Sequence, residues 1–463
     1  MERTHYRAPF ISLVRPRGSK MTKHENPMLW RTVIIPKQYC ATEVAKGFPV
    51  TFGGDIRIGD LRGTGQVDFL VYRSCADAHD GGGMKPCFLG AFTLEGEPIW
   101  HSGGGGTQPC RPGPVAVHDI DEDGQSEVIC FFLDESRQAA ATSMENVVIQ
   151  IRDGATGKIK HQRTPVELAA CSGYGPNWAH QRIMVANFRG MASSQDFVVK
   201  LGERVLAFDS NLNILWEYES PWTKYGHSPA YIPAVGDIDG DGRDEVNGGY
   251  FLLDHDGTVL WQNDIAPHMD SVAIAPWDNG RLRAICSGYG HVLDGSGRVI
   301  MKLGSELVPH GQEVRIGRFK SGGTTPQMIV RCNGHSTEVL VVDVDGAILK
   351  ELNLNPSPNN TGMEVVYWSG KERPALLYNG GMLWDPVQGA GISLPGLPPP
   401  EAVGRMDWYH CIPANVCGDH REELVLYNPW TTKVYIYTQH DNDESTFTGF
   451  KAGPRQYNPR LMD

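Results

Sequence analysis

The chain has 463 residues, a length that suits either one large fold or two modest domains. Hydrophobic residues make up 40% and charged residues 21%, which is typical of a globular protein and excludes disorder for most of the chain. Glycine (54) and proline (31) are abundant, which indicates many turns and few long helices. The formal net charge of −12 opposes binding to a phosphate backbone, so we expect no nucleic-acid partner.

The ten cysteines are scattered and form no Cys-x-x-Cys pair, which argues against a zinc ribbon, a redox motif or a dense disulfide framework. No segment reaches the roughly 18 apolar residues of a membrane span. The apolar run 8–14 is followed at once by Arg15-Pro16-Arg17, unlike a signal peptide. We therefore expect a cytoplasmic protein with reduced thiols and no membrane partner, and we expect it to be a monomer.

The first elements along the chain are a basic leader and a strand. Residues 1–25 contain a Pro-Arg-Gly-Ser run, and we expect them to be disordered. The segment 28–36 is apolar and belongs to no repeat, whereas the last repeat has only three clear strands, ending at 433–439. Pairing these two segments would close a ring and protect exposed strand edges. The alternative is that 28–36 only packs on the rim.

One unit recurs eight times between these two segments: an apolar strand, a short polar loop and a second apolar strand. The copies are 56–72, 115–132, 183–201, 233–250, 272–288, 314–331, 364–379 and 412–428. Their mean spacing of about 51 residues fits a blade of four strands. Hairpin patterns such as 205–218 and 251–261 supply the third and fourth strands.

This pattern predicts an all-β fold, a single β-propeller of eight blades whose ring is closed by the N-terminal strand. The count would be seven if one of the weakest copies, 364–379 or 412–428, is misread. The first strand of each blade is expected to line the central channel, and residues 26–463 are expected to form one catalytic domain.

Two loops between first and second strands carry a calcium pattern, with carboxylates at positions 1, 3, 5 and 9 and glycine at position 6. Their carboxylates are Asp119, Asp121, Asp123 and Glu127 in one loop, and Asp237, Asp239, Asp241 and Glu245 in the other. No helix pattern flanks them, so they are predicted to be strand-loop-strand calcium sites. The alternative is that such Asp-Gly turns persist through hydrogen bonds without a metal.

Four of the 16 histidines lie shortly before the first strands of consecutive repeats, so they are expected to ring one mouth of the channel: His180, His227, His268 and His310. Their polar and aromatic companions are Tyr174, Trp178, Arg182, Lys224, Tyr225, Asp270, Gln312, Asp407 and His410. Imidazoles, cations and aromatic rings together suit a carbohydrate site, where rings stack on sugar faces and a cation meets a carboxylate. The alternative is that the histidines are structural.

Two common chemistries lack their sequence motifs. No Gly-x-Ser-x-Gly elbow supports a serine nucleophile, and no Gly-x-x-x-x-Gly-Lys-Ser/Thr loop supports phosphate chemistry.

The segment 226–261, followed by 267–275, resembles the core of the family 11 polysaccharide lyases, the rhamnogalacturonan lyases. It is also similar to related propeller lyases and hydrolases that act on rhamnose–uronic acid linkages. The resemblance implies a calcium-bearing β-propeller, an acidic oligosaccharide or polysaccharide as substrate, and an active-site mouth that contains His227 and His268.

The reaction that the resemblance implies is β-elimination: a base removes the C5 proton of a uronic acid, a cation neutralises its carboxylate, and an acid protonates the leaving oxygen. We expect His227 or His268 as base, Arg182 or Lys224 as carboxylate partner, and Tyr174 or His180 as acid. A glycoside hydrolase of rhamnosidase type is the second interpretation, and a non-catalytic glycan- or protein-binding propeller is the third.

Overall fold

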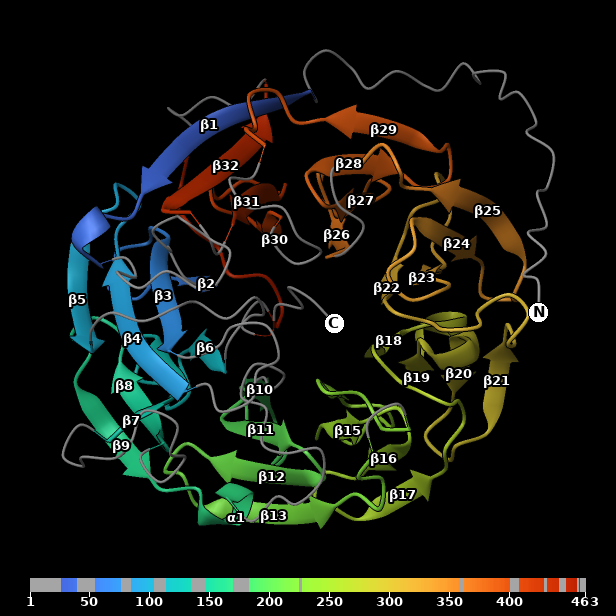
Figure 1. Ribbon diagram of the computed structural model, residues 1–463, viewed down its shortest axis with the longest axis horizontal. Coiled ribbons are helices and arrows are strands. Elements are labelled where there is room, and N and C mark those ends of the chain that lie inside the picture. Colours follow the sequence, from blue (N-terminus) through green and yellow to red (C-terminus); the bar gives the residue numbers. More distant parts are fainter. Residues whose placement is uncertain are drawn as a thin grey trace, which may run out of the picture.

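The computed structural model describes residues 26–39, 55–75, 85–103, 114–134, 147–169, 183–224, 227–357, 362–399, 408–428, 431–440, 447–455 and 458. They form eight four-stranded antiparallel sheets, arranged around a central axis like the blades of a propeller (Figure 1). The predicted β-propeller is confirmed, and its blade count is eight. Helix within the described ranges is limited to α1 (Val166–Ala169) and three short 3-10 turns, Lys37–Tyr39, Asp278–Gly280 and Gly288–Gly290.

Each blade runs from an inner strand at the channel to an outer strand on the rim (Figure 1). The inner strands of blades 1 to 8 are β2 (Asp55–Gly59), β6 (Val115–His118), β10 (Ile183–Ala186), β14 (Ala234–Gly236), β18 (Val272–Pro276), β22 (Val314–Gly317), β26 (Glu364–Val366) and β30 (His410–Ala414). The second strands are β3 (Asp68–Cys75), β7 (Glu127–Leu133), β11 (Asp196–Leu201), β15 (Glu245–Asn247), β19 (Leu282–Cys286), β23 (Gln327–Arg331), β27 (Leu376–Asn379) and β31 (Glu423–Tyr427). The third strands are β4 (Lys85–Phe92), β8 (Val147–Asp153), β12 (Arg204–Asp209), β16 (Phe251–Leu253), β20 (His291–Leu293), β24 (Glu338–Val342), β28 (Met382–Asp385) and β32 (Lys433–Gln439). The outer strands are β5 (Pro98–Gly103), β9 (Ile159–Arg163), β13 (Ile214–Glu219), β17 (Val259–Gln262), β21 (Val299–Lys302), β25 (Ile348–Asn353), β29 (Ala390–Ser393) and, in blade 8, β1 (Pro27–Ile34).

The hydrophobic core is divided among the interfaces between neighbouring blades. Val235 of blade 4 packs with Met184 of blade 3, for example, and Val272 of blade 5 packs with Ala234 of blade 4. Both faces of a blade are therefore buried, which explains why the second strands consist of near-continuous apolar runs. This packing fixes the blades side by side and sets the positions of the loops at both ends of the channel.

The ring is closed by strands from opposite ends of the chain. Strand β1 pairs antiparallel with β32, from Pro27 opposite Gln439 to Ile34 opposite Lys433. The predicted pairing of the N-terminal strand with the last repeat is confirmed, and the alternative, packing on the rim alone, is wrong. Closure leaves blade 8 no free outer edge on β32.

The described C-terminal residues link blades across the face that carries the loops between first and second strands. Phe450 N–H donates to Gly65 O of blade 1 at 2.7 Å, and Arg455 Nη2 lies 2.6 Å from Asp244 Oδ1 of blade 4. Asn458 exchanges two hydrogen bonds with the backbone of Val185 in blade 3. Nothing in the composition of this segment shows which blades it contacts.

The expectations of reduced thiols, of no membrane span and of a leader can each be compared with the described residues. The five cysteines whose side chains are described, Cys130, Cys286, Cys332, Cys411 and Cys417, are buried free thiols. No helix within the described ranges has the length and apolar character needed to cross a membrane. Residues 1–25, expected to be a leader, lie outside the described part of the chain.

Candidate active site

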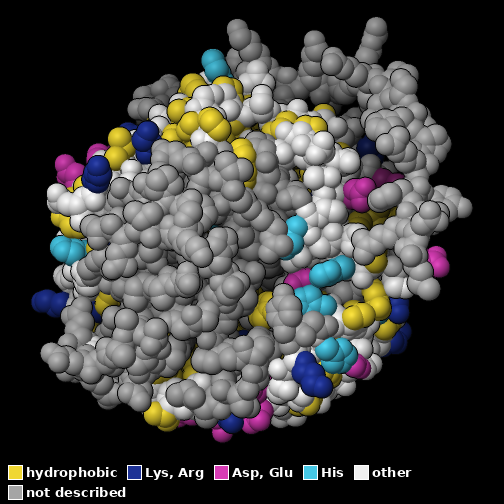
Figure 2. Space-filling view, viewed as in Figure 1, with side chains coloured by type: hydrophobic (Ala, Val, Ile, Leu, Met, Phe, Trp, Pro, Cys, Tyr) yellow, Lys and Arg dark blue, Asp and Glu magenta, His cyan; other side chains and the backbone are white. Residues whose placement is uncertain are grey.

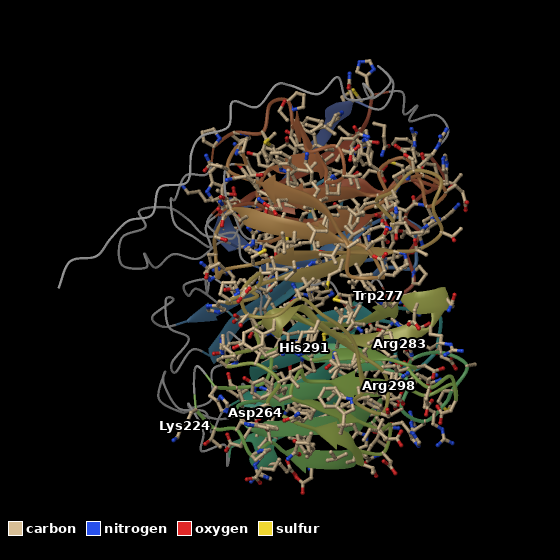
Figure 3. The ribbon with its side chains drawn as sticks, turned by 90° about the vertical axis from the view of Figure 1, so that its right-hand side faces the viewer. Lys224, Asp264, Trp277, Arg283, His291 and Arg298 are labelled. Atoms are coloured by element: carbon tan, nitrogen blue, oxygen red, sulfur yellow. The ribbon has the colours of Figure 1, made fainter. Side chains whose placement is uncertain are left out.

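Three of the four predicted mouth histidines are described, and each lies in the segment that leads into an inner strand of blades 4, 5 or 6. Histidine side chains gather on one side of the face shown in Figure 2. In Figure 3, Lys224 and Asp264 lie toward this same face, on the left, whereas Arg283 and Arg298 point to the opposite side. Arg283 lies at the start of β19, directly after the loop between the first and second strands of blade 5. The acidic loops are the corresponding loops of blades 2 and 4, so they and the histidine mouth are at opposite ends of the channel.

Asp270 is the centre of the site. Its Oδ1 lies 2.9 Å from His268 Nε2, and its Oδ2 lies 2.9 Å from His310 Nε2. The two imidazole centroids are 5.5 Å apart. Burial alone would raise the pKa of the Asp270 carboxyl, but the hydrogen bonds from both histidines outweigh it and hold this pKa below its ordinary value.

The same contact has the opposite effect on the histidine. The hydrogen bond to Asp270 raises the pKa of His310 above its ordinary value, against the opposing effect of burial. Near neutral pH, His310 therefore carries a proton more often than a free histidine does.

His227 has a carboxylate partner of its own. Its Nε2 lies 3.0 Å from Asp264 Oδ2, and about half of each side chain is exposed. A backbone bridge pairs His227 with Lys224, whose side chain is also exposed. The segment 264–270 thus supplies both carboxylates that face the histidines, Asp264 for His227 and Asp270 for the other two.

A cavity of about 300 Å³ opens beside these groups, between blades 5 and 6. It is lined by Ala266, Pro267, His268, Gly288, Tyr289, Pro309, His310 and Gly311. This volume is at the lower end of the range for small-ligand pockets. Tyr289 adopts φ of 53°, a left-handed conformation that is uncommon for a non-glycine residue and that occurs often at functional sites.

Close packing of backbone fixes the cavity wall. Any side chain at Gly311 would overlap the carbonyl oxygen of Ser287. Ser271 Oγ accepts a hydrogen bond from Val314 N at 3.2 Å, and so ties the inner strand of blade 6 to blade 5. His310 is consequently held in register with His268, which belongs to the preceding blade.

Several predicted site residues lie outside the described part of the chain: Tyr174, Trp178, His180, Arg182, Tyr225 and Asp407. His410 is described and is buried, stacked on Tyr427 with centroids 5.3 Å apart. Gln312 is also buried, and its backbone N–H donates to Arg331 O. The structure thus brings together His268, Asp270 and His310, and it places Lys224 beside His227.

Three residues of the site were not identified from the sequence. Asp264 lies 37 positions after its partner His227, so no local motif joins them. Tyr289 lies in a Gly-Tyr-Gly turn, and that turn is the one signal that could have marked it. Tyr231 lies with its ring centroid 6.4 Å from that of His268, and it has no pattern of its own.

His268, Asp270 and His310 could also hold a divalent cation, since their ligand atoms lie within 4.8 Å of one another. Two imidazoles with one carboxylate would suit zinc better than calcium. The two hydrogen bonds to Asp270 account for this arrangement without a metal.

The acidic loop of blade 4 has the geometry expected of a cation site. Ligand atoms of Asp237, Asp239 and Glu245 lie within 4.8 Å of one another. Gly242 has φ of 89°, which a residue with a side chain rarely adopts. Glu245 is fully buried, and its Oε1 accepts no hydrogen bond within the described part of the chain. Burial, with the charges of neighbouring aspartates, raises the pKa of Glu245 to about 8.

In the acidic loop of blade 2, ligand atoms of Asp119, Asp121 and Glu127 also lie within 4.8 Å of one another, but here the ammonium of Lys160 lies among the carboxylates. Its Nζ is 2.6 Å from Asp121, 3.1 Å from Asp123 and 3.0 Å from Glu127. Asp119 Oδ2 accepts a hydrogen bond from Gly124 N at 3.1 Å, whereas its buried Oδ1 accepts none within the described part of the chain. Both loops therefore have the predicted fold, but only the loop of blade 4 leaves an oxygen of its buried glutamate unpartnered.

Comparison with known proteins agrees with this architecture. The chain resembles the rhamnogalacturonan lyases. It is 24% identical over 308 residues to rhamnogalacturonan endolyase YesW of Bacillus subtilis (strain 168). The matched region covers 57% of this chain and 48% of that protein. It is 24% identical over 276 residues to rhamnogalacturonan exolyase YesX of the same organism, which covers 51% and 44%. The chain thus spans about half the length of the curated relatives that it matches. No protein-family model matches it.

Solved structures of rhamnogalacturonan lyases share the fold. The Bacillus licheniformis rhamnogalacturonan lyase PL11 superposes with a TM-score of 0.67 at 18% identity, over 93% of this chain and 78% of that chain. The YesW structure superposes with a TM-score of 0.66 at 17% identity, over 89% and 76%. These matches support the expected resemblance and the eight-bladed architecture.

Proposed function

We propose that the protein is a lyase that cleaves rhamnose–uronic acid linkages of acidic oligosaccharides or polysaccharides by β-elimination. The observation that carries this proposal is the set of His268, Asp270 and His310 beside a cavity. It is supported by the names of the two curated relatives, a rhamnogalacturonan endolyase and a rhamnogalacturonan exolyase. The elimination needs a base, a cation and an acid, and the described mouth offers one group for each.

His227 is the group that we assign to the C5 proton. When Nε2–H of a neutral imidazole donates to a carboxylate, as it can here to Asp264, the lone pair remains on Nδ1. About half of the His227 side chain is exposed, so a sugar can reach the ring. The adjacent ammonium of Lys224 is assigned to the carboxylate of the uronic acid, where it would stabilise charge as the proton leaves.

His310 is the group that we assign to the leaving oxygen. Its raised pKa favours the protonated imidazole, which is the form that an acid requires. Asp270 maintains this state, and His268 fixes the other oxygen of Asp270. The acids predicted from the sequence, Tyr174 and His180, lie outside the described residues, so their role stays a prediction.

The hydrolase alternative fits the described carboxylates less well. Hydrolysis usually needs a carboxylic acid with a raised pKa opposite a second carboxylate. The pKa of Asp270 is lowered, and both of its oxygens face histidines. Asp270 is therefore suited to holding imidazolium and unsuited to donating a proton.

Calcium is proposed as a structural ion in the blade 4 loop, held by Asp237, Asp239 and Glu245, with Asp241 beside them. The support is the unpartnered Oε1 of the buried Glu245, which a cation would satisfy. The loop faces away from the histidine mouth, so the ion would stabilise the fold and take no part in proton transfer.

The test is to incubate the full chain with rhamnogalacturonan oligosaccharides and to follow ultraviolet absorbance together with new reducing ends. Elimination creates a conjugated 4,5-unsaturated uronic acid, so we expect both signals to rise together. Reducing ends without absorbance would indicate the hydrolase, and binding without either signal would indicate a glycan-binding propeller. His161→Ala on the outer strand β9 is the control variant and should keep the wild-type rate.

A further inference from the structure

The second strand of most blades begins with a buried polar side chain that holds the preceding loop. Asp68, Glu127, Asp196, Glu245, Gln327 and Glu423 each occupy this first position, and all are fully buried. Each of the last five accepts a hydrogen bond from a backbone N–H of its loop, as Glu127 does from Ile120 at 3.1 Å. All six residues except Gln327 are carboxylates. Each of these five carboxylates needs a partner for its remaining oxygen, because a buried unpaired charge is costly.

Four of these carboxylates find that partner within the protein. Arg62 lies 2.8 Å from Asp68 Oδ1 in blade 1, and Arg189 lies 2.7 Å from Asp196 Oδ1 in blade 3. Lys160 binds Glu127 Oε1 in blade 2, and Thr438 donates to Glu423 Oε1 in blade 8. Glu245 of blade 4 is the one of the five without such a partner among the described residues.

The position of Lys160 in its blade is unusual. It is the extra residue of a β-bulge, because Arg152 pairs with Ile159 whereas Ile151 pairs with His161. The same bulge recurs between the third and fourth strands of five other blades. Its extra residue there is Ile99, Leu215, Leu260, Ile300 or Leu349. A lysine therefore occupies a position that is apolar in every other blade with this bulge, and it does so in a blade with a complete set of loop carboxylates.

The geometry matches the needs of an ammonium ion. A lysine Nζ has three N–H donors, and here three carboxylates lie 2.6 to 3.1 Å from it. The side chain of Glu127 is 1% exposed and that of Lys160 is 25% exposed, so the contact to Glu127 is largely shielded from water. Calcium would need six to eight oxygens in the same space.

We propose that Lys160 replaces the metal ion of the blade 2 loop, so that this loop binds no calcium although its sequence matches a calcium site. The identity of one bulge residue then decides whether the carboxylates of a loop are neutralised by a lysine ammonium or by a calcium ion from solution. The inference concerns Asp119, Asp121, Asp123 and Glu127, and it does not depend on the proposed lyase activity.

The test is to count bound calcium in the full chain by equilibrium dialysis with elemental analysis. Lys160→Leu introduces the side chain that blade 4 carries at Leu260, and we expect it to bind one more calcium per chain than the wild type. In chelator this variant should melt below the wild type, and added calcium should raise its melting temperature more than that of the wild type. Lys158→Leu changes an exposed neighbouring lysine, and it should leave the calcium count unchanged.

A second substitution keeps the test decisive if Lys160→Leu folds poorly. Asp121→Asn in the wild-type background should leave the calcium count unchanged, whereas in the Lys160→Leu background it should remove the added ion. The proposal is overturned if Asp121→Asn removes a calcium from the wild type, or if folded Lys160→Leu gains none.

Discussion

Replacing Asp270 by asparagine would test how the two histidines share one carboxylate. The substitution keeps the size of the side chain but removes the carboxylate whose hydrogen bond and charge raise the pKa of His310. An asparagine has one oxygen to accept a hydrogen bond, and its amide group only donates, so one imidazole loses its acceptor. A hydrogen bond to a charged group contributes about 1.5–3 kcal/mol, so we expect the free energy of unfolding to fall by about 2 kcal/mol.

The effect on activity should depend on pH. A group with a raised pKa stays protonated as pH increases toward that value, and loss of the raising charge removes its proton at lower pH. We expect Asp270→Asn to reduce kcat/KM by roughly 10²-fold or more, and to do so more strongly at about pH 8 than at about pH 6. Initial rates of ultraviolet absorbance on rhamnogalacturonan oligosaccharides measure this loss.

Asp278→Asn is the matched control for Asp270→Asn. Asp278 lies 2.6 Å from Arg283 of the same blade, and Arg283 lies toward the opposite face (Figure 3). This variant should keep the wild-type kcat/KM at both pH values. The reasoning would be refuted if Asp270→Asn retained wild-type kcat/KM at about pH 8 with its fold intact.

Three further predictions concern stability. Ile35→Ala, in the buried contact between the ring closure and blade 1, should lower the free energy of unfolding by about 3 kcal/mol in urea denaturation. Ile34→Ala, next to it but 54% exposed, should cost less than about 1 kcal/mol; equal costs would contradict the closure account. His310→Asn should destabilise the protein more at about pH 5.5 than at about pH 9, because the stability gained from a raised histidine pKa is present below the unfolded pKa and is lost as pH rises through the folded one. Asp239→Asn should lower the melting temperature in excess calcium but hardly in chelator, because only the folded loop binds the ion. Asp256→Asn is the control and should not change how the melting temperature depends on calcium. Equal melting temperatures of the wild type and Asp239→Asn in calcium would argue against a bound ion.

The repeats carry most of the information about the fold. Their spacing of about 51 residues predicts four-stranded blades, and the missing fourth strand of the last repeat predicts that an N-terminal segment pairs with 433–439. Both inferences depend on local patterns of apolar and turn residues, which the chain shows directly.

The chemistry of the site was harder to predict because its partners come from different blades. The spacing of His268 and Asp270 is visible in the sequence, but His310 reaches the same carboxylate only because blade 6 packs on blade 5. Lys160 is likewise separated by 33 residues from Glu127, and only the pairing of β8 with β9 brings it to the loop. Such contacts depend on register and packing, which no short motif records.

The mass of the products tests the central claim most directly. β-Elimination adds no water, so the masses of the two fragments of a rhamnogalacturonan oligosaccharide should sum to that of the substrate. Hydrolysis adds one water to that sum. We predict that the wild-type chain gives the elimination masses and that His227→Ala and His310→Ala give roughly 10²-fold less of the same products. Products that contain one added water, or wild-type yields from both histidine variants, would contradict elimination at this mouth.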